Sequence, residues 1–344
     1  MYEDRVLKVL IVCHAGVGVG LGHLSRSLVV AHALQQELGA QVQFLIQGDL
    51  VSLNVIDKFV HQFLPSNESL MKEVALLAWQ NDIHLLVFDL HPLKIPSDID
   101  DLFVDLRANG RKLVTVDALA THSRYLDLVF IPAFQFNPPP NTENVDKFIY
   151  GWDCFLLNVQ QAPYPWQAGK NILVLSGGSD ATELGRSWPC ELNEDLPDDS
   201  NLHWITGPFA QAPVWPEYLR IKMHNHIAPT GLDNFMVNAN YAVTVYGVSF
   251  YELLHYGVPT VVFSPYGNKD NSELKEISEL GVALVATDEH DAIKKLMTIM
   301  EDKQLAATLS LKSLRQMSAP GKYKFTSSIA ALFVSAGSNM KRNV

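Results

Sequence analysis

The chain reads Gly16-Val17-Gly18-Val19-Gly20-Leu21-Gly22-His23-Leu24-Ser25-Arg26 between an apolar run and an amphipathic stretch. The apolar run, 6–12, is rich in β-branched residues and is typical of a buried strand. The stretch 24–38 fits one face of a helix that ends just before Gly39. The alternating glycines therefore fill a strand-to-helix turn, where the backbone can approach a ligand closely. Their spacing matches neither the dinucleotide-binding fingerprint nor the P-loop, so the sequence predicts neither site.

His23 lies at or near the first turn of this predicted helix. The positive end of the peptide dipoles disfavours an imidazolium there and keeps the ring neutral. A neutral imidazole at the carboxyl edge of a parallel sheet is a candidate general base. The alternative is a histidine that only caps the helix or packs under the loop.

The composition indicates a globular protein of two domains. At 344 residues the chain is too long for one ordinary core, and 48% of it is hydrophobic against 18% charged. No apolar run reaches the roughly 20 residues that cross a bilayer. A formal charge of -11 without a basic block argues against nucleic-acid partners, although backbone amides can still bind a diphosphate. The acidic first residues lead straight into a strand, which predicts no signal peptide and a cytoplasmic protein.

The cysteines and histidines indicate no metal centre. Three widely spaced cysteines fit a reducing compartment and form no C-x-x-C motif: Cys13, Cys154 and Cys190. The twelve histidines include one close pair, His224 and His226, which no cluster of carboxylates or cysteines completes. We therefore expect this pair to be solvated or to lie at the edge of the core.

Strands and helices alternate along the first part of the chain, which is typical of a parallel sheet covered by helices on both faces. We expect strands at 41–46, 84–89, 112–117 and 128–131, and helices at 68–80 and 98–109. Asp89 and Asp117 end two of these strands, at the edge where open α/β sheets place their sites. Either carboxylate can orient His23 or bind sugar hydroxyls, and capping the following loop is the alternative.

A second α/β half follows an irregular connection. Residues 132–146 contain Pro138-Pro139-Pro140-Asn141 and show no periodicity. The alternation then restarts, with strands expected at 171–175, 202–206, 241–245, 260–263 and 282–285. We expect one helix that begins at 181 and another, after the 246–249 loop, that ends at 255 or 256. Further helices are expected at 272–280, 288–300 and 322–336.

Two loops of the second half place small residues between a strand and a helix N-terminus: 176–180 and 246–249. Adjacent backbone amides and the helix dipole make an anion pocket at such a position without a lysine. Glu252 lies one turn into the second of these helices, where its carboxylate can meet ribose hydroxyls. The alternatives are a tight turn for each loop and a partner of the helix dipole for Glu252.

Six short motifs occur in a specific order over most of the chain, from about residue 9 to 285: Gly22-His23-x-x-Arg26, Asp89, Val116-Asp117, 151–157, 175–180 and 246–259. This order resembles the UDP-sugar hydrolases of pseudaminic acid synthesis and the spore-coat polysaccharide proteins predicted to be glycosyltransferases. More distantly, it resembles the MurG-type N-acetylglucosaminyltransferases. The resemblance implies an α/β GT-B fold of two doubly wound, Rossmann-like domains with an inter-domain cleft. Residues 1–148 would form the acceptor side with the catalytic histidine loop, and 149–344 the nucleotide-sugar side.

The resemblance also implies site residues. The histidine of the family's G-H-x-x-R motif falls on His23, as the base that activates the attacking oxygen. The residues implied to bind the nucleotide sugar are Gly20, Gly22, Gly177, Gly178, Ser179, Tyr246, Gly247, Ser249 and Glu252. The residues considered for contacts to the sugar or the acceptor are Arg26, Asp89, Asp117, Asn268, Lys269 and Asp270. For Arg26 we favour an ion pair with a nearby acid.

One departure from the family pattern concerns the sugar. Relatives carry an asparagine-glutamine or double-glutamine motif before the next helix, where this chain has Asn268-Lys269-Asp270-Asn271. The identity of the sugar therefore does not transfer. The departure weakens the match to the hydrolases and favours transfer to an acceptor.

The expected reaction is a single displacement that inverts the anomeric centre. Neutral His23 takes a proton from an acceptor hydroxyl or from water, and loop amides and helix N-termini stabilise the leaving diphosphate. The UDP-sugar is the substrate and no cofactor or metal is expected, since no D-x-D pair lies near the site. Three hypotheses remain: a glycosyltransferase of surface-glycan or related sugar metabolism with a glycan, lipid or small-molecule acceptor, a UDP-sugar hydrolase, and a sugar-nucleotide-binding protein without turnover.

Overall fold

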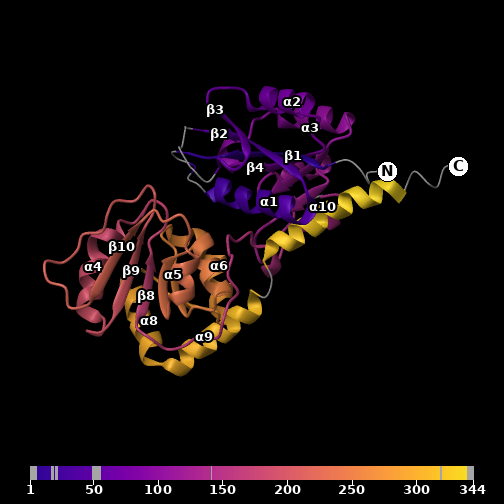
Figure 1. The fold of residues 1–344 in the computed structure, drawn as a ribbon. Helices are drawn as coiled ribbons and strands as arrows, with labels where there is room; N and C mark the ends of the chain where they lie inside the picture. Colours follow the sequence, from indigo (N-terminus) through magenta and orange to yellow (C-terminus); the bar gives the residue numbers. More distant parts are fainter. Residues whose placement is uncertain are drawn as a thin grey trace. The chain divides into compact units, whose positions relative to one another are not determined.

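The computed structural model describes residues 6–16, 19, 22–48, 56–140, 142–317 and 320–338. The chain divides into two units: unit 1 is Met1–Asn158 together with Ala319–Val344, and unit 2 is Val159–Ser318. Each unit is built on one parallel sheet with helices against it (Figure 1). The predicted α/β class with two parallel sheets is confirmed.

Unit 1 has the sheet order β3-β2-β1-β4-β5-β6-β7. Its strands are β1 (Lys8–His14), β2 (Gln41–Gln47), β3 (Val60–Leu64), β4 (Leu85–Asp89), β5 (Lys112–Val116), β6 (Leu128–Phe130) and β7 (Phe148–Ile149). Its helices are α1 (Gly22–Leu38), α2 (Leu70–Gln80), α3 (Ile99–Ala108) and α10 (Gly321–Ser338), with short 3-10 turns η1 (Pro92–Lys94), η2 (Ala120–Tyr125), η3 (Val145–Lys147) and η4 (Trp152–Cys154).

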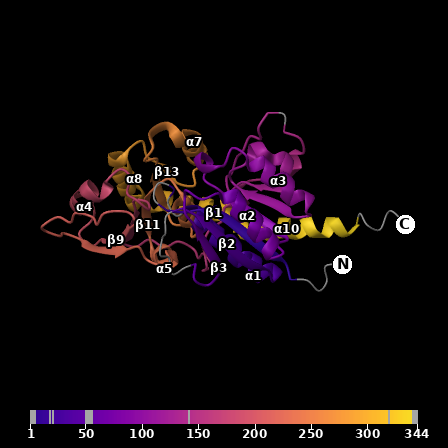
Figure 2. The ribbon, with the colours of Figure 1, turned by 90° about the horizontal axis from the view of Figure 1, so that it is seen from above.

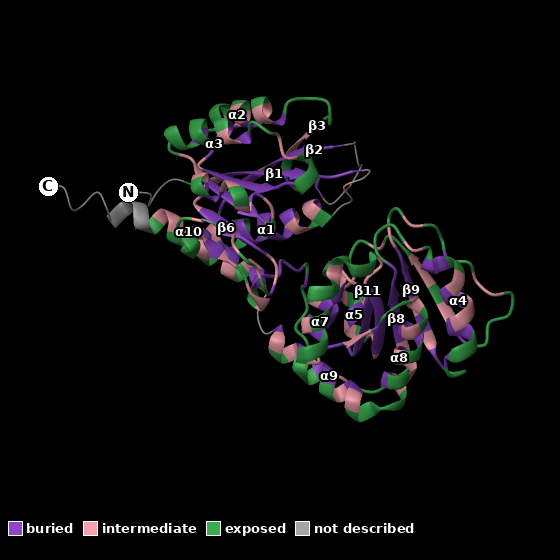
Figure 3. Ribbon diagram, turned by 180° about the vertical axis from the view of Figure 1, so that it is seen from behind, coloured by how far each residue is buried: buried purple, intermediate pink, exposed green. Residues whose placement is uncertain are grey.

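Both faces of the central strand β1 are buried because it lies between two layers of helices. Val9 and Ile11 pack in the cluster that α1 and α10 cover. Leu10 and Val12 pack in the cluster that α2 and α3 cover. This alternation follows from the two-residue period of a strand, and it explains the continuous apolar run that the sequence shows. Figure 3 shows the strands as buried and the outer faces of the helices as exposed.

The helix α10 returns to unit 1 after the chain has completed unit 2. It packs beside α1 (Figures 1 and 2), and its Phe325 lies edge-on to Phe130 of β6, with ring centroids 5.1 Å apart. Phe325 and Ile329 are fully buried. The division therefore differs from the predicted boundary at 148/149 in two ways: residues up to 158 and the last helix both belong to the first unit.

Unit 2 has the sheet order β10-β9-β8-β11-β12-β13. Its strands are β8 (Asn171–Leu175), β9 (Asn201–Thr206), β10 (Lys222–Ile227), β11 (Tyr241–Val245), β12 (Thr260–Phe263) and β13 (Leu284–Val285). Its helices are α4 (Leu184–Asp195), α5 (Asp233–Asn238), α6 (Val248–His255), α7 (Asn271–Leu280), α8 (Glu289–Glu301) and α9 (Lys303–Gln316), with the 3-10 turn η5 (Gly267–Asp270).

Most predicted elements are confirmed, and the largest difference at a helix start is that of α4. The helix expected from residue 181 starts at Leu184, because Asp180 and Glu183 adopt left-handed backbone conformations with φ of 48° and 57°. Among the described residues no helix has both the length and the apolar character needed to cross a bilayer.

Candidate active site

The carboxyl edge of the unit 1 sheet carries the candidate base. His23 is the second residue of α1, as the sequence predicts, and its side chain is 13% exposed. The helix starts at Gly22, beyond the end of β1. Gly20, predicted to contact the nucleotide sugar, lies outside the described residues, as do Val17, Gly18 and Leu21.

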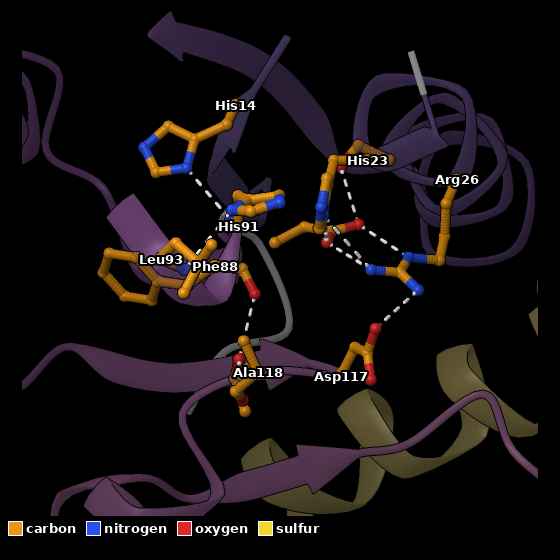
Figure 4. Close-up of polar contacts among 11 residues, drawn as sticks. His14, His23, Arg26, Phe88, His91, Leu93, Asp117 and Ala118 are labelled. Atoms are coloured by element: carbon orange, nitrogen blue, oxygen red, sulfur yellow. Dashed lines mark hydrogen bonds and ion pairs between the residues drawn. The ribbon is translucent and has the colours of Figure 1, made fainter. Parts of the chain in front are cut away.

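Asp89, the last residue of β4, joins His23 to Arg26. His23 Nδ1 lies 2.6 Å from Asp89 Oδ1. Arg26 donates from Nε to Oδ2 at 2.8 Å and from Nη2 to Oδ1 at 2.5 Å, a two-point ion pair (Figure 4). The one-turn spacing on α1 places His23 and Arg26 on the same helix face. The predicted pairing of Arg26 with an acid is confirmed.

These contacts assign the proton on the His23 ring. At 2.6 Å two acceptors would repel, so Nδ1 carries hydrogen and donates it to Asp89 Oδ1. In the neutral ring Nε2 then holds the lone pair. A buried carboxylate therefore fixes the tautomer and leaves the other ring nitrogen as a proton acceptor, which is the arrangement of a histidine that acts as a general base.

The charge of Arg26 keeps Asp89 ionised. Asp89 is 1% exposed, and burial by itself raises the pKa of its carboxyl. The Arg26 guanidinium and the hydrogen bonds from Arg26 and His23 outweigh burial, so the pKa of Asp89 lies below its ordinary value. In return, the carboxylate raises the pKa of Arg26 against the opposing effect of burial.

Asp117 is the outer member of the group. It follows β5, and its carboxylate accepts from Arg26 Nη1 at 3.1 Å. Its side chain is 53% exposed. Its φ of 71° lies in the left-handed region, which a residue other than glycine seldom adopts. The backbone N–H of Asp117 donates to the carbonyl of Phe130 in β6, which holds this conformation.

In unit 2, the Gly177–Gly178–Ser179 loop follows β8 and is exposed. Gly177 has a φ of 91°, and the carbonyl of Gly178 accepts from the backbone N–H of Phe209 at 3.0 Å. A Cβ at Gly207 would lie 2.4 Å from that carbonyl oxygen. The loop is therefore held by close contact with the turn after β9.

The first amides of α4 already have a partner, so the predicted anion site at this loop is left with the amides of Gly177–Ser179 and without the helix N-terminus. Asp180 accepts from the backbone N–H of Leu184 at 3.0 Å and from that of Gly185 at 2.9 Å. Its carboxylate thus satisfies amides at the start of the helix and neutralises the positive end of the dipole.

The N-terminus of α6 is different. Gly247 is its N-cap, and no side chain among the described residues caps the helix there. Ser249 lies in the first turn and is half-buried, whereas Glu252, one turn in, is buried. Near the neighbouring strand end, Ser176 Oγ is buried and has no hydrogen-bond partner within the described part of the chain. This helix start keeps donors for an anion.

Tyr246, the residue before Gly247, shares a hydrogen bond between hydroxyls with Tyr251, with the two oxygens 2.6 Å apart. Burial and, to a lesser degree, the charges of Glu273 and Asp270 raise the pKa of Tyr246 to about 12. Both hydroxyls therefore stay protonated at neutral pH, and since one donates to the other, one O–H of the pair remains to donate to another acceptor.

Three of the predicted sugar contacts, Asn268, Lys269 and Asp270, lie in η5, directly before α7. Asp270 accepts from Ser264 Oγ at 2.5 Å, and the Lys269 ammonium lies 5.2 Å from the centre of the Tyr266 ring. Asn268 Oδ1 accepts from the Asn271 side chain at 3.1 Å. Asn268 and Lys269 are exposed.

The histidine pair of β10 lies at the edge of the unit 2 core, as predicted. His224 is exposed and half-buried His226 stacks against His203 of β9, with ring centroids 5.3 Å apart. Nowhere in the described ranges do three or more histidine, cysteine or carboxylate residues gather so that they could hold a metal ion.

Sequence reasoning missed two histidines of the unit 1 site. His91 lies beside His23 with ring centroids 5.8 Å apart, edge to face. His14, the last residue of β1, is fully buried and contacts the backbone of His91. The available signal was the alternation after β4, since residues two apart on an extended chain share a side and His91 follows Asp89 by two.

Comparisons with known proteins identify the fold. No family model matches the chain. An uncharacterized protein of Methanocaldococcus jannaschii is 23% identical over 307 residues, which are 79% of this chain and 59% of that protein. The chain thus spans about three fifths of the length of this curated relative.

Solved structures match nearly the whole chain. MurG of Acinetobacter baumannii aligns over 94% of this chain and 99% of its own, with a TM-score of 0.65 and 17% identity. UGT2 of Phytolacca americana, complexed with UDP-2-fluoro-glucose and pterostilbene, aligns over 95% and 99%, with a TM-score of 0.62 and 13% identity. A putative UDP-N-acetylglucosamine 2-epimerase of Listeria monocytogenes aligns over 96% and 97%, with a TM-score of 0.62 and 14% identity. The chain has the GT-B fold of these proteins, as predicted.

Proposed function

We propose that the protein is a glycosyltransferase that moves a sugar from UDP to an acceptor hydroxyl, with His23 as the general base. The observation that carries this proposal is the hydrogen bond from His23 Nδ1 to the buried carboxylate of Asp89. The GT-B fold supports it, because UGT2, which aligns with nearly the whole chain, is complexed with UDP-2-fluoro-glucose and with a second small molecule, pterostilbene. Fold alone does not decide function, so the site carries the argument.

The base acts through Nε2. This nitrogen takes the proton of the attacking hydroxyl as the oxygen bonds to the anomeric carbon and the bond to the UDP oxygen breaks. The resulting imidazolium keeps its Nδ1–H on ionised Asp89, which stabilises the new positive charge. A single displacement of this kind inverts the anomeric centre.

We propose that the α6 N-terminus binds the leaving diphosphate. Charge grows on the leaving oxygen in the transition state, and main-chain N–H groups with the helix dipole stabilise it where it develops. The proposed donors are the amides of Gly247 and Ser249 and the hydroxyl of the Tyr246–Tyr251 pair. Gly177–Ser179 and Glu252 are proposed to contact the diphosphate and the ribose. In this mechanism no metal ion is needed, so removal of divalent cations with EDTA is expected to leave the rate unchanged.

A UDP-sugar hydrolase is the second candidate. The sequence resemblance to the hydrolases of pseudaminic acid synthesis favours it, and the same base can activate water. The chain departs from that family's pattern at Asn268-Lys269-Asp270-Asn271, which favours the transferase. The resemblance to spore-coat polysaccharide proteins supports a role in surface-glycan synthesis.

The first experiment separates these candidates. The protein is incubated with UDP-glucose, UDP-galactose and UDP-N-acetylglucosamine, and UDP release is measured with and without a panel of acceptors. A transferase releases UDP at an appreciable rate only with an acceptor, whereas a hydrolase releases UDP and free sugar without one.

Binding is measured in parallel, by the rise in melting temperature that UDP causes through its preference for the folded state. His23→Ala is expected to keep this rise and lose turnover. The matched control is His32→Ala, which alters an exposed histidine on the same helix. Wild-type turnover in His23→Ala would exclude His23 as the base, and UDP binding without any turnover would indicate a binding protein.

A further inference from the structure

His14 is a buried polar residue with no role in the mechanism above. It ends β1 and is 0% exposed. The alternation along β1 places it on the same side as Leu10 and Val12, towards α2 and α3, whereas the Asp89 side chain meets α1 on the opposite side. A polar ring at such a position is costly to bury unless both of its nitrogens are satisfied.

Both nitrogens of His14 have partners, and the partners come from the two neighbouring strands. Nδ1 accepts from the backbone N–H of His91, which follows β4, at 2.9 Å. Nε2 lies 3.3 Å from Oε1 of Gln47, the last residue of β2. Since Nδ1 is an acceptor, Nε2 carries the hydrogen and donates it to Gln47. Gln47 in turn donates from Nε2 to the carbonyl of Glu68 at 2.9 Å.

His91 connects this buried contact to the base. Its ring meets that of His23 edge to face, at an interplanar angle of 69°. Figure 4 shows the two labelled side chains next to each other. His91 Nδ1 accepts from the backbone N–H of Leu93 at 3.3 Å and so caps the turn η1. His91 is therefore held at two points. Its backbone is bonded to His14, and its ring is bonded to the backbone of the turn η1.

We propose that His14 is a positioning residue for the His23 base and acts through His91. The bond from the His91 backbone to His14 Nδ1 fixes the chain after β4, and this places the His91 ring where it limits the movement of the His23 ring. Asp89 holds the His23 ring at Nδ1, and the His91 ring packs edge to face with the His23 ring. The inference rests on the proposed function for its effect on rate, but the placement of the rings can be tested without any substrate.

A neutral histidine suits this role because one small ring accepts at one nitrogen and donates at the other. Asparagine can still accept the hydrogen bond from the His91 backbone, because its Oδ1 is bonded to Cγ as Nδ1 is in histidine. Leucine fills the space and can form neither the bond to the His91 backbone nor the bond to Gln47. The comparison of His14→Asn with His14→Leu therefore isolates the bond to His91, and His32→Leu controls for a histidine-to-leucine change elsewhere on unit 1.

The substrate-free test uses protein labelled with 15N at histidine. Two-bond 1H–15N spectra are expected to show hydrogen on Nε2 of His14 and on Nδ1 of His23, and ring-to-ring NOEs are expected between His91 and His23. In His14→Leu these NOEs disappear and the ring signals of both residues shift, whereas His14→Asn and His32→Leu keep them. A folded His14→Leu protein with unchanged His23 and His91 signals would overturn the proposal.

The kinetic test is a double-mutant cycle on the UDP-sugar that the first experiment finds most active. We expect His14→Leu to lower kcat about tenfold with little change in KM, because small misplacement of a catalytic group acts on the transition state. His91→Ala is expected to lower kcat equally, and the double variant no further, since both act through one contact. Wild-type kcat in His91→Ala, or additive losses in the double variant, would contradict the proposal, and His91→Ala decides it even if His14→Leu does not fold.

The two proposals fail in different ways. If no UDP-sugar is turned over, the proposed function is wrong while the NOE comparison still decides whether His14 positions the rings. If turnover occurs and the NOEs and kcat are unaffected in His14→Leu, the proposed function stands and the positioning role is wrong.

Discussion

A single carboxylate oxygen at the end of β4 has two donors. Asp89 Oδ1 accepts from His23 Nδ1 and from Arg26 Nη2, while Oδ2 accepts from Arg26 Nε. The arginine fixes the rotation of the carboxylate, and the carboxylate fixes the rotation of the imidazole. Charge and orientation in the site therefore depend on the same atoms.

Asp89→Asn tests this dependence. The amide keeps the shape of the side chain but lacks the charge that stabilises an imidazolium on His23, and it leaves the Arg26 guanidinium partly unpaired. We expect kcat to fall by roughly 100-fold or more and the protein to lose about 1–3 kcal/mol of stability. Asp117→Asn is the matched change at the half-exposed partner and is expected to have a much smaller effect on both quantities, measured by steady-state kinetics and urea unfolding.

His14 makes the folded state sensitive to acid. Burial, together with the nearby charges of His23, Lys94 and His91, lowers the pKa of His14 from 6.5 to about 4, against the raising effect of its bond to Gln47. Between these two values the unfolded chain binds a proton that the folded chain does not, so stability falls as the pH drops from about 6.5 to 4. The loss from this group is at most about 3 kcal/mol. Urea unfolding at several pH values measures it.

The control for this pH effect is His14→Asn, which cannot take up the proton. Its stability is expected to change less between pH 6.5 and 4 than that of the wild type. Equal slopes for the two proteins would show that His14 is not the group responsible. The depressed pKa of Asp89 acts at lower pH, since its stabilisation is lost only as the pH falls through that pKa.

At the scale of elements, the loops of unit 2 depend on close backbone contacts. A Cβ at Gly207 would lie 2.4 Å from Gly178 O and 2.5 Å from Gly177 O, which are main-chain atoms that cannot rotate away. We expect Gly207→Ala to destabilise the protein by about 2 kcal/mol through overpacking and to weaken UDP binding. At Gly178 nothing lies within 4 Å of an added Cβ, so Gly178→Ala is the stability control. Equal melting temperatures for the two variants would contradict the packing argument.

The elements that the sequence did not predict include edge strands, the short helix α5 and the 14-residue helix α9. β3 and β10 end their sheets. Both strands mix polar with apolar residues, and apart from Leu64 none of these residues is fully buried. Such strands lack the apolar run that predicted β1 and β4. The central strands, by contrast, are buried on both faces and were predicted within a few residues.

The candidate site was predictable only in part, for a related reason. His23, Arg26 and Asp89 follow from strand ends and one helical turn, which are local features of the sequence. The contact of His14 with His91 joins residues 77 apart and depends on the order of three strands in the sheet. The occupied N-terminus of α4 depends on left-handed backbone at Asp180 and Glu183, which the residue types do not indicate.

At the scale of the molecule, unit 1 depends on a helix that the chain supplies last. Phe325 and Ile329 of α10 belong to the same core cluster as Val9 and Ile11 of β1. We expect Phe325→Ala to destabilise unit 1 by about 3–5 kcal/mol, because it leaves a cavity in that cluster. Val334→Ala on the same helix alters an exposed residue and is expected to cost no more than about 0.5 kcal/mol.

Calorimetry distinguishes the units if they melt separately. Phe325→Ala is expected to lower the transition of unit 1 and leave that of unit 2 in place. A shift confined to the transition of unit 2 would contradict the assignment of α10 to unit 1.

The return of α10 also sets an order of events during synthesis. A ribosome that has completed β7 must still translate the whole of unit 2 before Phe325 and Ile329 emerge. At 5–20 residues per second this takes on the order of 10–35 s. Throughout that interval the nascent first unit exposes the apolar strip of α1 and the sheet that α10 later covers. The second unit, whose segments are contiguous, can fold first, and chaperones that shield apolar surface would act on the half of the chain that is made earlier.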